Sequence, residues 1–263
     1  MNAEIFLNEL DSRIKKYDLL RHPFYRAWSS GALTRDDLRE YACDYYHHVA
    51  AFPSYLAQLG IRLEEGELRR AVLANMSDER GGEDAFGMPE QPHAELWLDF
   101  AEGMGARRSL RGHQPITEVK GLMDFFRRVA SEGSPEEVLA AFYTYESQVP
   151  RIAQEKARGL KEMYGADEKT YSYFTLHTTA DVYHSQVWRL QLVKLLEENP
   201  SRAEAALASA EKAAMALWTA LDGIEQRRTA PTAASTKTPS KYPLSDANAV
   251  SVVGLENVGV RVT

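Results

Sequence analysis

The sequence predicts an all-α protein, with a helical domain over residues 1–228 and a disordered tail over residues 229–263. Three observations support this prediction. Apolar residues recur at helical spacing in successive segments, residues typical of helix caps precede several of these segments, and no segment alternates apolar and polar residues as a strand does. With 263 residues, of which 44% are hydrophobic, the chain can bury a sizeable core.

The first long helix is predicted over residues 34–58. Thr34 is a favourable N-cap, and Asp36 and Asp37 lie in the first turn, where the helix dipole favours acidic groups. Pro53 predicts a bend near the C-terminal end. The large residues on one face of this helix are Tyr41, Tyr45, His48, Phe52 and Tyr55.

Three shorter helices are predicted next. The first runs from Leu68 to Met76 and ends before Gly81 and Gly82. A loop with two prolines leads to the second, from Glu95 to Met104. The third runs from Thr117 to Ala130.

Two long helices and an alanine-rich helix complete the predicted bundle. Residues 134–137 (SPEE) form a capping box with proline at the first helical position, and they begin a helix that continues to about Met163. Gly165 ends it. A second helix is predicted from about Lys169 to Glu198, and the alanine-rich helix covers residues 202–226.

The tail differs in composition from the rest of the chain. From about Thr229 the residues are mostly Pro, Ser, Thr and Ala, which cannot form a packed core and predict disorder. Residues 250–263 (VSVVGLENVGVRVT) could form a strand or a docking peptide. A short apolar run alone leaves both alternatives open.

Composition and charge limit the classes of function. The single cysteine, Cys43, excludes an internal disulfide, and the N-terminal segment lacks the basic and apolar regions of a signal peptide. No apolar run approaches the roughly 20 residues of a membrane span, and the net charge of −7 argues against a nucleic-acid surface. We therefore expect a cytoplasmic protein whose partners are small molecules, with no nucleic acid and no membrane.

The most informative stretch is HTTADVYH, residues 177–184. His177, Asp181 and His184 stand at i, i+4 and i+7, so they share one face of a continuous helix. Two imidazoles and one carboxylate are ligands that non-haem iron, manganese or zinc accepts. We interpret this face as half of a metal site. The ordinary alternative is an aromatic-rich helix whose histidines bond neighbouring carbonyl groups.

A second helix offers a further ligand. A dinuclear centre in a helical bundle needs inward-facing acids and histidines from several helices. Glu146 lies on the apolar stripe that carries Phe142 and Val149, where a buried charge needs a partner. Pro150 removes the hydrogen bond that the Glu146 carbonyl would accept, and so it predicts a bend beside the carboxylate.

Three motifs resemble the CADD-like family, which takes its name from the chlamydial death-domain-associating protein. They are residues 20–28 (LRHPFYRAW), residues 145–153 (YESQVPRIA) and the HxxxDxxH pattern of residues 177–184. The resemblance covers most of residues 5–225, and the motifs occur in the family's order. The family belongs to the haem-oxygenase-like dimetal oxidases, so the resemblance implies a TenA/PqqC-like helical bundle, with the tail outside it.

The resemblance also implies the metal ligands and the cofactors. Carried over by motif, the ligands are Glu79, His93, Glu146, His177, Asp181 and His184. The metals would be two irons, or iron plus manganese, with dioxygen and a reductant as co-substrates. Glu79 and His93 are further apart here than in the family's pattern, so Asp78 and Glu83 are alternatives to Glu79. Two divalent ions and three carboxylates would leave a net charge of about +1, which suits anionic oxygen species.

The activity that the resemblance implies is synthesis of para-aminobenzoate from one of the protein's own tyrosines. Tyr25 would be the sacrificed ring, Lys156 the amine donor and Tyr41 an electron relay. An oxygen-activating centre, an oxidisable phenol and an amine held nearby form a coherent set. Taken singly, Tyr25 and Tyr41 are more typical of packing, and Lys156 is more typical of a solvated helix surface. Related bundles associate through helices, so we expect a homodimer.

Other functions stay open at this point. An oxidase of the same fold could act repeatedly on a fatty acid or an amino acid, with the same metal ligands. A metal-free TenA- or PqqC-like enzyme is disfavoured, because it would not need six ligand-type residues and because LAAFYTYES, residues 139–147, contains no cysteine. A protein that only binds a partner is the third alternative, and no residue here indicates such an interface.

Overall fold

The structure is a computed structural model that describes residues 2–82, 88 and 90–230. Its regular elements in these ranges are all helical, which confirms the all-α prediction. The predicted tail from Pro231 onward, including the segment of residues 250–263, lies outside the described residues, and so does Glu83. Among the described residues, no helix combines the length and the apolar character that crossing a bilayer requires.

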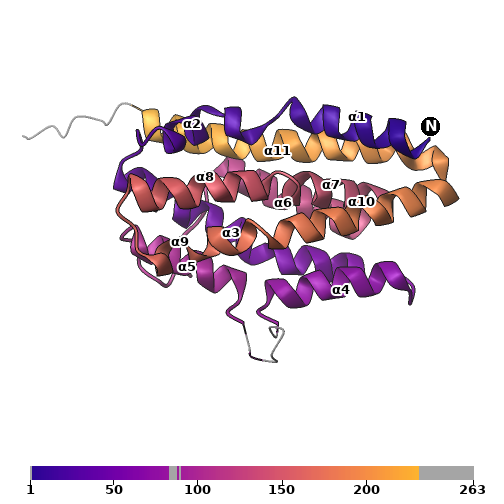
Figure 1. The fold of residues 1–263 in the computed structure, drawn as a ribbon, viewed down its shortest axis with the longest axis horizontal. Coiled ribbons are helices and arrows are strands. Elements are labelled where there is room, and N and C mark those ends of the chain that lie inside the picture. The colour runs from indigo at the N-terminus through magenta and orange to yellow at the C-terminus, as the bar shows by residue number, and fades with distance from the viewer. Residues whose placement is uncertain (1, 83–87, 89, 231–263) are drawn as a thin grey trace, which may run out of the picture. The chain divides into compact units, whose positions relative to one another are not determined.

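The described residues form eleven α-helices and two short 3-10 helices (Figure 1). The α-helices are α1 (Ala3–Lys15), α2 (Pro23–Ser29), α3 (Arg35–Gly60), α4 (Glu67–Glu79), α5 (His93–Gly103), α6 (Thr117–Glu132), α7 (Pro135–Glu146), α8 (Val149–Glu162), α9 (Glu168–His177), α10 (Ala180–Glu198) and α11 (Ala203–Thr229). The 3-10 helices are η1 (Leu19–Arg21) and η2 (Pro200–Arg202). The helices α1 and α2 lie before the first helix that the spacing predicts.

The predicted caps are present. The Thr34 hydroxyl accepts a hydrogen bond from the Asp37 amide at 3.1 Å, and the Asp37 carboxylate accepts one from the Thr34 amide at 2.7 Å. Ser134 and Glu137 form the same reciprocal pair at the start of α7. Each pair satisfies amides that the first turn leaves free. The helix α3 continues through Pro53 to Gly60.

The predicted helix from residue 134 to Met163 is wrong as one element. It is two helices, because α7 ends at Glu146 and α8 begins at Val149. Pro150 has no amide hydrogen to give to the Glu146 carbonyl, and it occupies the first turn of α8, where that loss costs nothing. The proline therefore ends a helix instead of bending one.

The predicted helix from Lys169 to Glu198 is also two helices. The helix α9 ends at His177 and α10 begins at Ala180. The Thr178 hydroxyl donates to the Thr175 carbonyl at 2.7 Å, and the Thr179 hydroxyl donates to the Leu176 carbonyl at 3.2 Å. The amides of both threonines bond the same two carbonyls, which tightens the last turn and breaks the α-helical ladder.

The core is built around α7, in which every residue from Val138 to Glu146 is buried. A helix that is apolar on all sides belongs inside a bundle, and α6, α10 and α11 pack against this one. The helices α1 and α11 lie side by side along the upper edge in Figure 1. Glu146 is the last residue of α7, so its carboxylate lies at the end of this buried helix.

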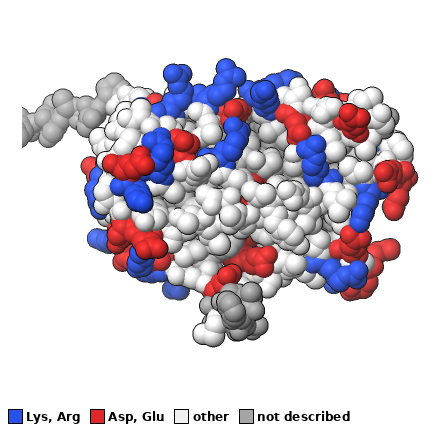
Figure 2. Space-filling view, in the orientation of Figure 1, with Lys and Arg blue, Asp and Glu red and all other residues white. Residues whose placement is uncertain are grey.

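The visible face carries mixed charges. Figure 2 shows acidic and basic side chains interspersed around the margin, with mostly other residues in the middle of the face. On this face, and for the residues that the structure describes, no continuous basic area of the type that binds nucleic acid is present.

Candidate active site

Six buried acids and histidines form two neighbouring groups. The first group is Glu79, His93 and His177, and the second is Glu146, Asp181 and His184. Within each group, one ligand atom from each residue lies within 4.8 Å of the other two. The charge of Asp181 also raises the pKa of His93 in the other group, so the groups lie close to one another. All six residues predicted as ligands therefore meet in one region.

The prediction of one shared face for His177, Asp181 and His184 is wrong. His177 is the last residue of α9 and lies in the first group, whereas Asp181 and His184 lie on α10 and in the second group. The break at Thr178 and Thr179 turns the histidine away from the face of α10. One motif in the sequence therefore contributes to both groups.

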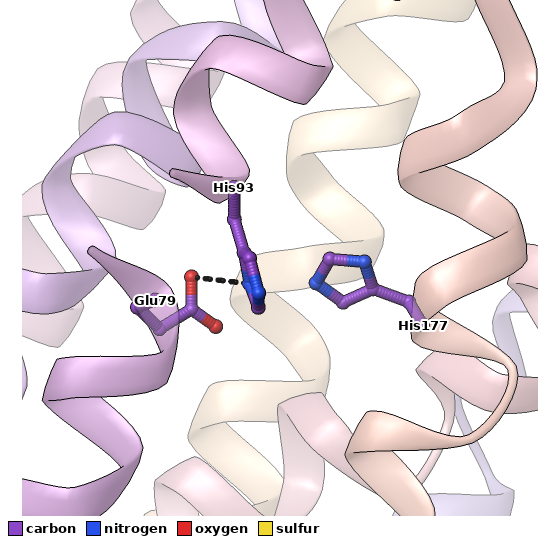
Figure 3. Close-up of side chains that lie close together, drawn as sticks. All are labelled: Glu79, His93 and His177. Carbon is purple, nitrogen blue, oxygen red and sulfur yellow. Dashed lines mark ion pairs between the residues drawn. The ribbon is translucent and has the colours of Figure 1, made fainter. Parts of the chain in front are cut away.

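Three helix ends supply the first group (Figure 3). Glu79 ends α4, His93 begins α5 and His177 ends α9. The Glu79 Oε2 lies 3.0 Å from the His93 Nδ1, and the two imidazole rings meet edge to face at 4.6 Å. The His177 Nδ1 donates to the Tyr173 carbonyl at 2.7 Å. Because a carbonyl only accepts, His177 keeps its Nε2 lone pair for a ligand.

Electrostatics make Glu79 and His93 an ion pair. Burial disfavours the Glu79 carboxylate, but the charge and hydrogen bond of His93 hold the pKa of Glu79 below its usual value. Burial likewise disfavours the His93 cation, and Glu79 raises the pKa of His93 above its usual value. A divalent ion would replace the imidazole proton in this pair.

The second group is held by hydrogen bonds to Glu146. The Asn75 side-chain amide donates to the Glu146 Oε1 at 3.1 Å, and the Trp188 indole donates to the Oε2. Asp181 and His184 are one turn apart on α10, with the Asp181 Oδ1 3.5 Å from the His184 Nδ1. Burial and the charge of Asp181 raise the pKa of Glu146 well above its usual value. This carboxylate therefore needs a cation to stay ionised.

Sequence reasoning missed Asn75 and Trp188. A signal for both exists in the spacing, since Asn75 precedes Glu79 by four residues and Trp188 follows His184 by four. Residues four apart share a helix face. Each of the two thus lies one turn from a candidate ligand and supports the carboxylate of Glu146 from another helix.

The structure gives Glu79 and the alternative ligand Asp78 different surroundings. Glu79 is buried and contacts His93, in the first group. The Asp78 carboxylate is half-exposed and lies 3.2 Å from the His184 Nε2, at the outer side of the second group. Glu83 lies outside the described residues.

The donor atoms fit divalent metal ions. Among the described residues, the buried Nδ1 of His184 and the buried Oδ1 of Asn75 form no hydrogen bond. Such atoms are costly unless a ligand satisfies them. Carboxylate oxygens and imidazole nitrogens suit iron and manganese. Each group offers three protein ligands, which leaves coordination positions for other molecules.

The three residues predicted for the chemistry also meet. The Lys156 Nζ lies 3.0 Å from the Tyr25 hydroxyl and hydrogen-bonds the Tyr41 hydroxyl. The two phenol oxygens are 3.2 Å apart. The amine lies 4.4 Å from the centre of the Tyr25 ring. Lys156 belongs to α8, Tyr25 to α2 and Tyr41 to α3, so three helices form this lysine–tyrosine cluster.

Burial sets the protonation of the lysine–tyrosine cluster. It lowers the pKa of Lys156 well below its usual value, with no opposing charge. It raises the pKa of Tyr25 and of Tyr41. Burial therefore favours an amine with a free electron pair beside two neutral phenols.

A small cavity adjoins the lysine–tyrosine cluster, and one of its lining residues, Tyr173, contacts the first group. Its volume is about 30 Å³, and Tyr25, Lys156, Tyr145 and Tyr173 line it with seven further residues. The Tyr173 ring stacks on the His177 imidazole at 4.0 Å. The cavity can hold a molecule of the size of water. Sequence reasoning missed Tyr173, although it precedes His177 by one helical turn.

Comparison with known proteins identifies the family. The family model described as iron-containing redox enzyme matches residues 39–218. The chain belongs to this family of iron-containing redox enzymes. It is therefore an oxidoreductase, and the predicted resemblance is confirmed.

Relatives and solved structures agree with this family. The chain is 36% identical over 211 residues to the 4-aminobenzoate synthase of Chlamydia pneumoniae, with 80% of this chain and 90% of that protein covered. It is 36% identical over 238 residues to the 4-aminobenzoate synthase of Nitrosomonas europaea, with 86% and 93% covered. The fold is similar to that of a TenA homolog from Pseudomonas syringae pv. tomato, with a TM-score of 0.69, 15% identity, and 85% and 92% covered. The predicted haem-oxygenase-like, TenA-like fold is confirmed.

Proposed function

We propose that this iron-containing redox enzyme makes 4-aminobenzoate, a precursor for folate biosynthesis, from its own Tyr25. Lys156 supplies the amino group. The observation that carries the proposal is the direct contact of the Lys156 amine with the Tyr25 phenol, beside a cavity whose lining residue Tyr173 stacks on the candidate ligand His177. Relatives at 36% identity carry the name of this activity.

The atoms of Tyr25 match the product. In a tyrosine side chain, the hydroxyl lies para to the carbon that joins the ring to the backbone. In 4-aminobenzoate, an amine lies para to a carboxyl carbon. The conversion therefore forms a bond from the Lys156 Nζ to the ring carbon that carries the hydroxyl, and breaks that C–O bond, the lysine Cε–Nζ bond and the tyrosine Cα–Cβ bond. The phenol oxygen leaves as water, the lysine Cε stays on the chain as an aldehyde, and the Cα of residue 25 gains a hydrogen and stays as a glycine. Two dioxygen molecules and two electrons with two protons balance these changes and give two water molecules in all. The Cβ is oxidised to the carboxyl carbon, with dioxygen as oxidant and a reductant as electron source.

The chain's own residues prepare this reaction. Burial lowers the pKa of Lys156 and so favours its neutral amine, whose electron pair is free. Tyr41 contacts both the amine and the Tyr25 hydroxyl, and it holds a proton or passes an electron between them. Aromatic rings surround the reacting atoms, and the adjoining cavity has room for about one molecule of the size of water.

Two divalent ions would be held by Glu79, His93 and His177 on one side and by Glu146, Asp181 and His184 on the other. When bound, they supply oxidising power from dioxygen. Their identity is two irons, or iron plus manganese, because the same ligands accept both metals.

The test loads the metal-free protein anaerobically with Fe(II), or with Fe(II) plus Mn(II), and then adds dioxygen and a reductant. We expect no more than a single equivalent of 4-aminobenzoate per chain, with the mass change mapped to Tyr25 and Lys156. Comparison of the two loadings identifies the metal pair. Repeated turnover of an added fatty acid or amino acid, with both residues intact, would instead identify an oxidase of an external substrate.

We further propose that the enzyme acts as a cytoplasmic homodimer on small molecules and dioxygen, without nucleic acid or membrane. The expected result of light scattering on the full chain is the mass of two chains. A monomer that retains full activity would contradict this proposal.

A further inference from the structure

Asp78 and Glu79 are adjacent acids at the end of α4, but their side chains have different surroundings. Glu79 is buried in the first group. The Asp78 carboxylate is 51% exposed, and its Oδ2 lies 3.2 Å from the His184 Nε2. His184 itself is buried, with 5% of its side chain exposed. Asp78 therefore approaches the second group from the solvent side.

This contact assigns the two nitrogens of His184. A carboxylate accepts hydrogen bonds and cannot donate them, so the His184 Nε2 donates to Asp78. The Nδ1 then faces the Asp181 Oδ1 at 3.5 Å, and it is buried without a hydrogen-bond partner among the described residues. It is the nitrogen left for a ligand shared with Asp181 and Glu146.

A cavity adjoins this contact. It has a volume of about 40 Å³ between α4 and α10, and its lining includes Asp78, His184, Asn75 and Trp188. The last two residues hold the Glu146 carboxylate. The cavity is thus lined by the three residues that contact Glu146 and His184 from outside the second group, which are Asn75, Trp188 and Asp78. Without the Asp78 side chain, the cavity would leave the His184 ring room to rotate.

We propose that Asp78 is a positioning residue, which holds the His184 ring so that the Nδ1 binds the metal ion shared with Glu146 and Asp181. The inference rests on the proposed dimetal function. Histidine ligands commonly donate their second N–H to a carboxylate, which fixes the ring and its tautomer. Loss of such a partner typically weakens metal binding by about 10–100-fold.

The chain contains a matched pair that serves as a control. The His22 Nε2 lies 3.0 Å from the Asp222 Oδ1, with His22 fully buried and Asp222 46% exposed. The two pairs are thus alike in distance and exposure. They differ at the second nitrogen, because the His22 Nδ1 accepts a hydrogen bond from the Phe24 amide at 3.1 Å. Both nitrogens of His22 are satisfied, and the pair is structural.

The experiment titrates metal-free Asp78→Ala, Asp78→Asn and Asp222→Ala proteins with Co(II) in competition with a chelator. Co(II) reports each site by its ligand-field absorbance as well as by its affinity. We expect Asp78→Ala to weaken one of the two ions by about 10–100-fold and to change the absorbance of that ion alone. Asp78→Asn keeps an acceptor oxygen, so its metal affinity should fall less than that of Asp78→Ala. Asp222→Ala should bind both ions as the parent does.

Two results would overturn the inference. In one, Asp78→Ala binds both ions with the parent's affinities and spectrum. In the other, it weakens both ions equally, as a general loss of packing would. Failure of the proposed dimetal centre is a separate outcome, because the parent protein itself would then bind no pair of ions. Circular dichroism of each variant shows whether the bundle is folded.

Discussion

The first carboxylate–histidine group and the lysine–tyrosine cluster are two buried polar regions with opposite electrostatics. In the first, charges of opposite sign meet, as in the 3.0 Å contact of Glu79 with His93. In the second, the Lys156 amine meets only neutral phenol oxygens, one of them at 3.0 Å. Opposite charges favour the ionised forms, whereas burial alone favours the neutral form.

The two regions therefore suit two different chemical roles within one bundle. An ion-binding site needs carboxylates that stay ionised, and a nucleophilic amine needs an electron pair that no proton occupies. The cavity of about 30 Å³ adjoins the lysine–tyrosine cluster, and its lining residue Tyr173 stacks on His177. Variants that remove one region should therefore leave the properties of the other unchanged.

The largest effect is expected from Glu146→Ala. It removes a candidate ligand and leaves the Asn75 amide and the Trp188 indole without their acceptor. Metal binding should weaken by more than about 100-fold, which exceeds the usual cost of losing an outer partner, and product should fall below detection. Metal analysis and the single-turnover product assay measure the two effects. The exposed Glu162→Ala variant is the control, and a Glu146→Ala protein with parental metal content would contradict the assignment.

Lys156→Met should abolish the product but leave metal binding intact. Methionine fills similar space and carries no amine. The same two measurements apply, with Lys161→Met as the control at an exposed position of α8. If Lys156→Met forms 4-aminobenzoate at the parental level, the lysine is not the amine donor. If it also loses its metals, the two regions are not independent.

Tyr41→Phe should slow product formation by roughly 100-fold, the usual contribution of a positioned proton-transfer group. The Tyr25 ring and the Lys156 amine remain, so the final yield should stay near the parental value. A rapid-quench time course separates rate from yield. Tyr55→Phe, on the same helix and buried, is the matched control. An unchanged rate in Tyr41→Phe would remove this tyrosine from the mechanism.

The smallest expected effect is on the pH dependence of the free energy of unfolding. Because burial lowers the pKa of Lys156 in the folded protein, the unfolded chain binds one more proton there between the lowered value and about 10.5. Stability of the parent should therefore rise with pH in this window, by at most about 1.4 kcal/mol per pH unit. The free energy of unfolding of Lys156→Met should lack this slope. The difference between the two proteins should therefore change in favour of the parent from pH 7 to pH 10. Urea denaturation at several pH values measures it, and parallel curves would contradict a buried neutral amine.

From Thr34 onward the sequence predicts helices well and their interruptions poorly, whereas α1 and α2 are not predicted. Spacing and caps locate α3, and the capping box at Ser134 locates the start of α7. The break after His177 is not visible in the pattern, since threonine is compatible with a helix. It becomes clear only when the Thr178 and Thr179 hydroxyls are seen to bond back to carbonyl groups of α9.

For the candidate site too, the sequence predicts some features and not others. Residue type and spacing identify Asp181, His184 and Glu146, and the family's motifs add Glu79 and His93. Which helices face one another depends on packing, so the sequence shows neither the pairing of ligands into two groups nor the support of Glu146 from other helices. The role of each site residue stays a prediction until the variants are measured.

The burial of Tyr25 gives the proposed reaction a consequence for the lifetime of the protein. The ring is 4% exposed and packs among the rings of Phe24 and Tyr41. If it leaves as product, the bundle keeps a hole, and loss of a buried aromatic side chain costs about 3–5 kcal/mol. That is a large part of the roughly 5–15 kcal/mol that keeps a domain folded. A spent chain would unfold more often than a fresh one and would be digested first by proteases, so supply of the product would follow synthesis of the protein.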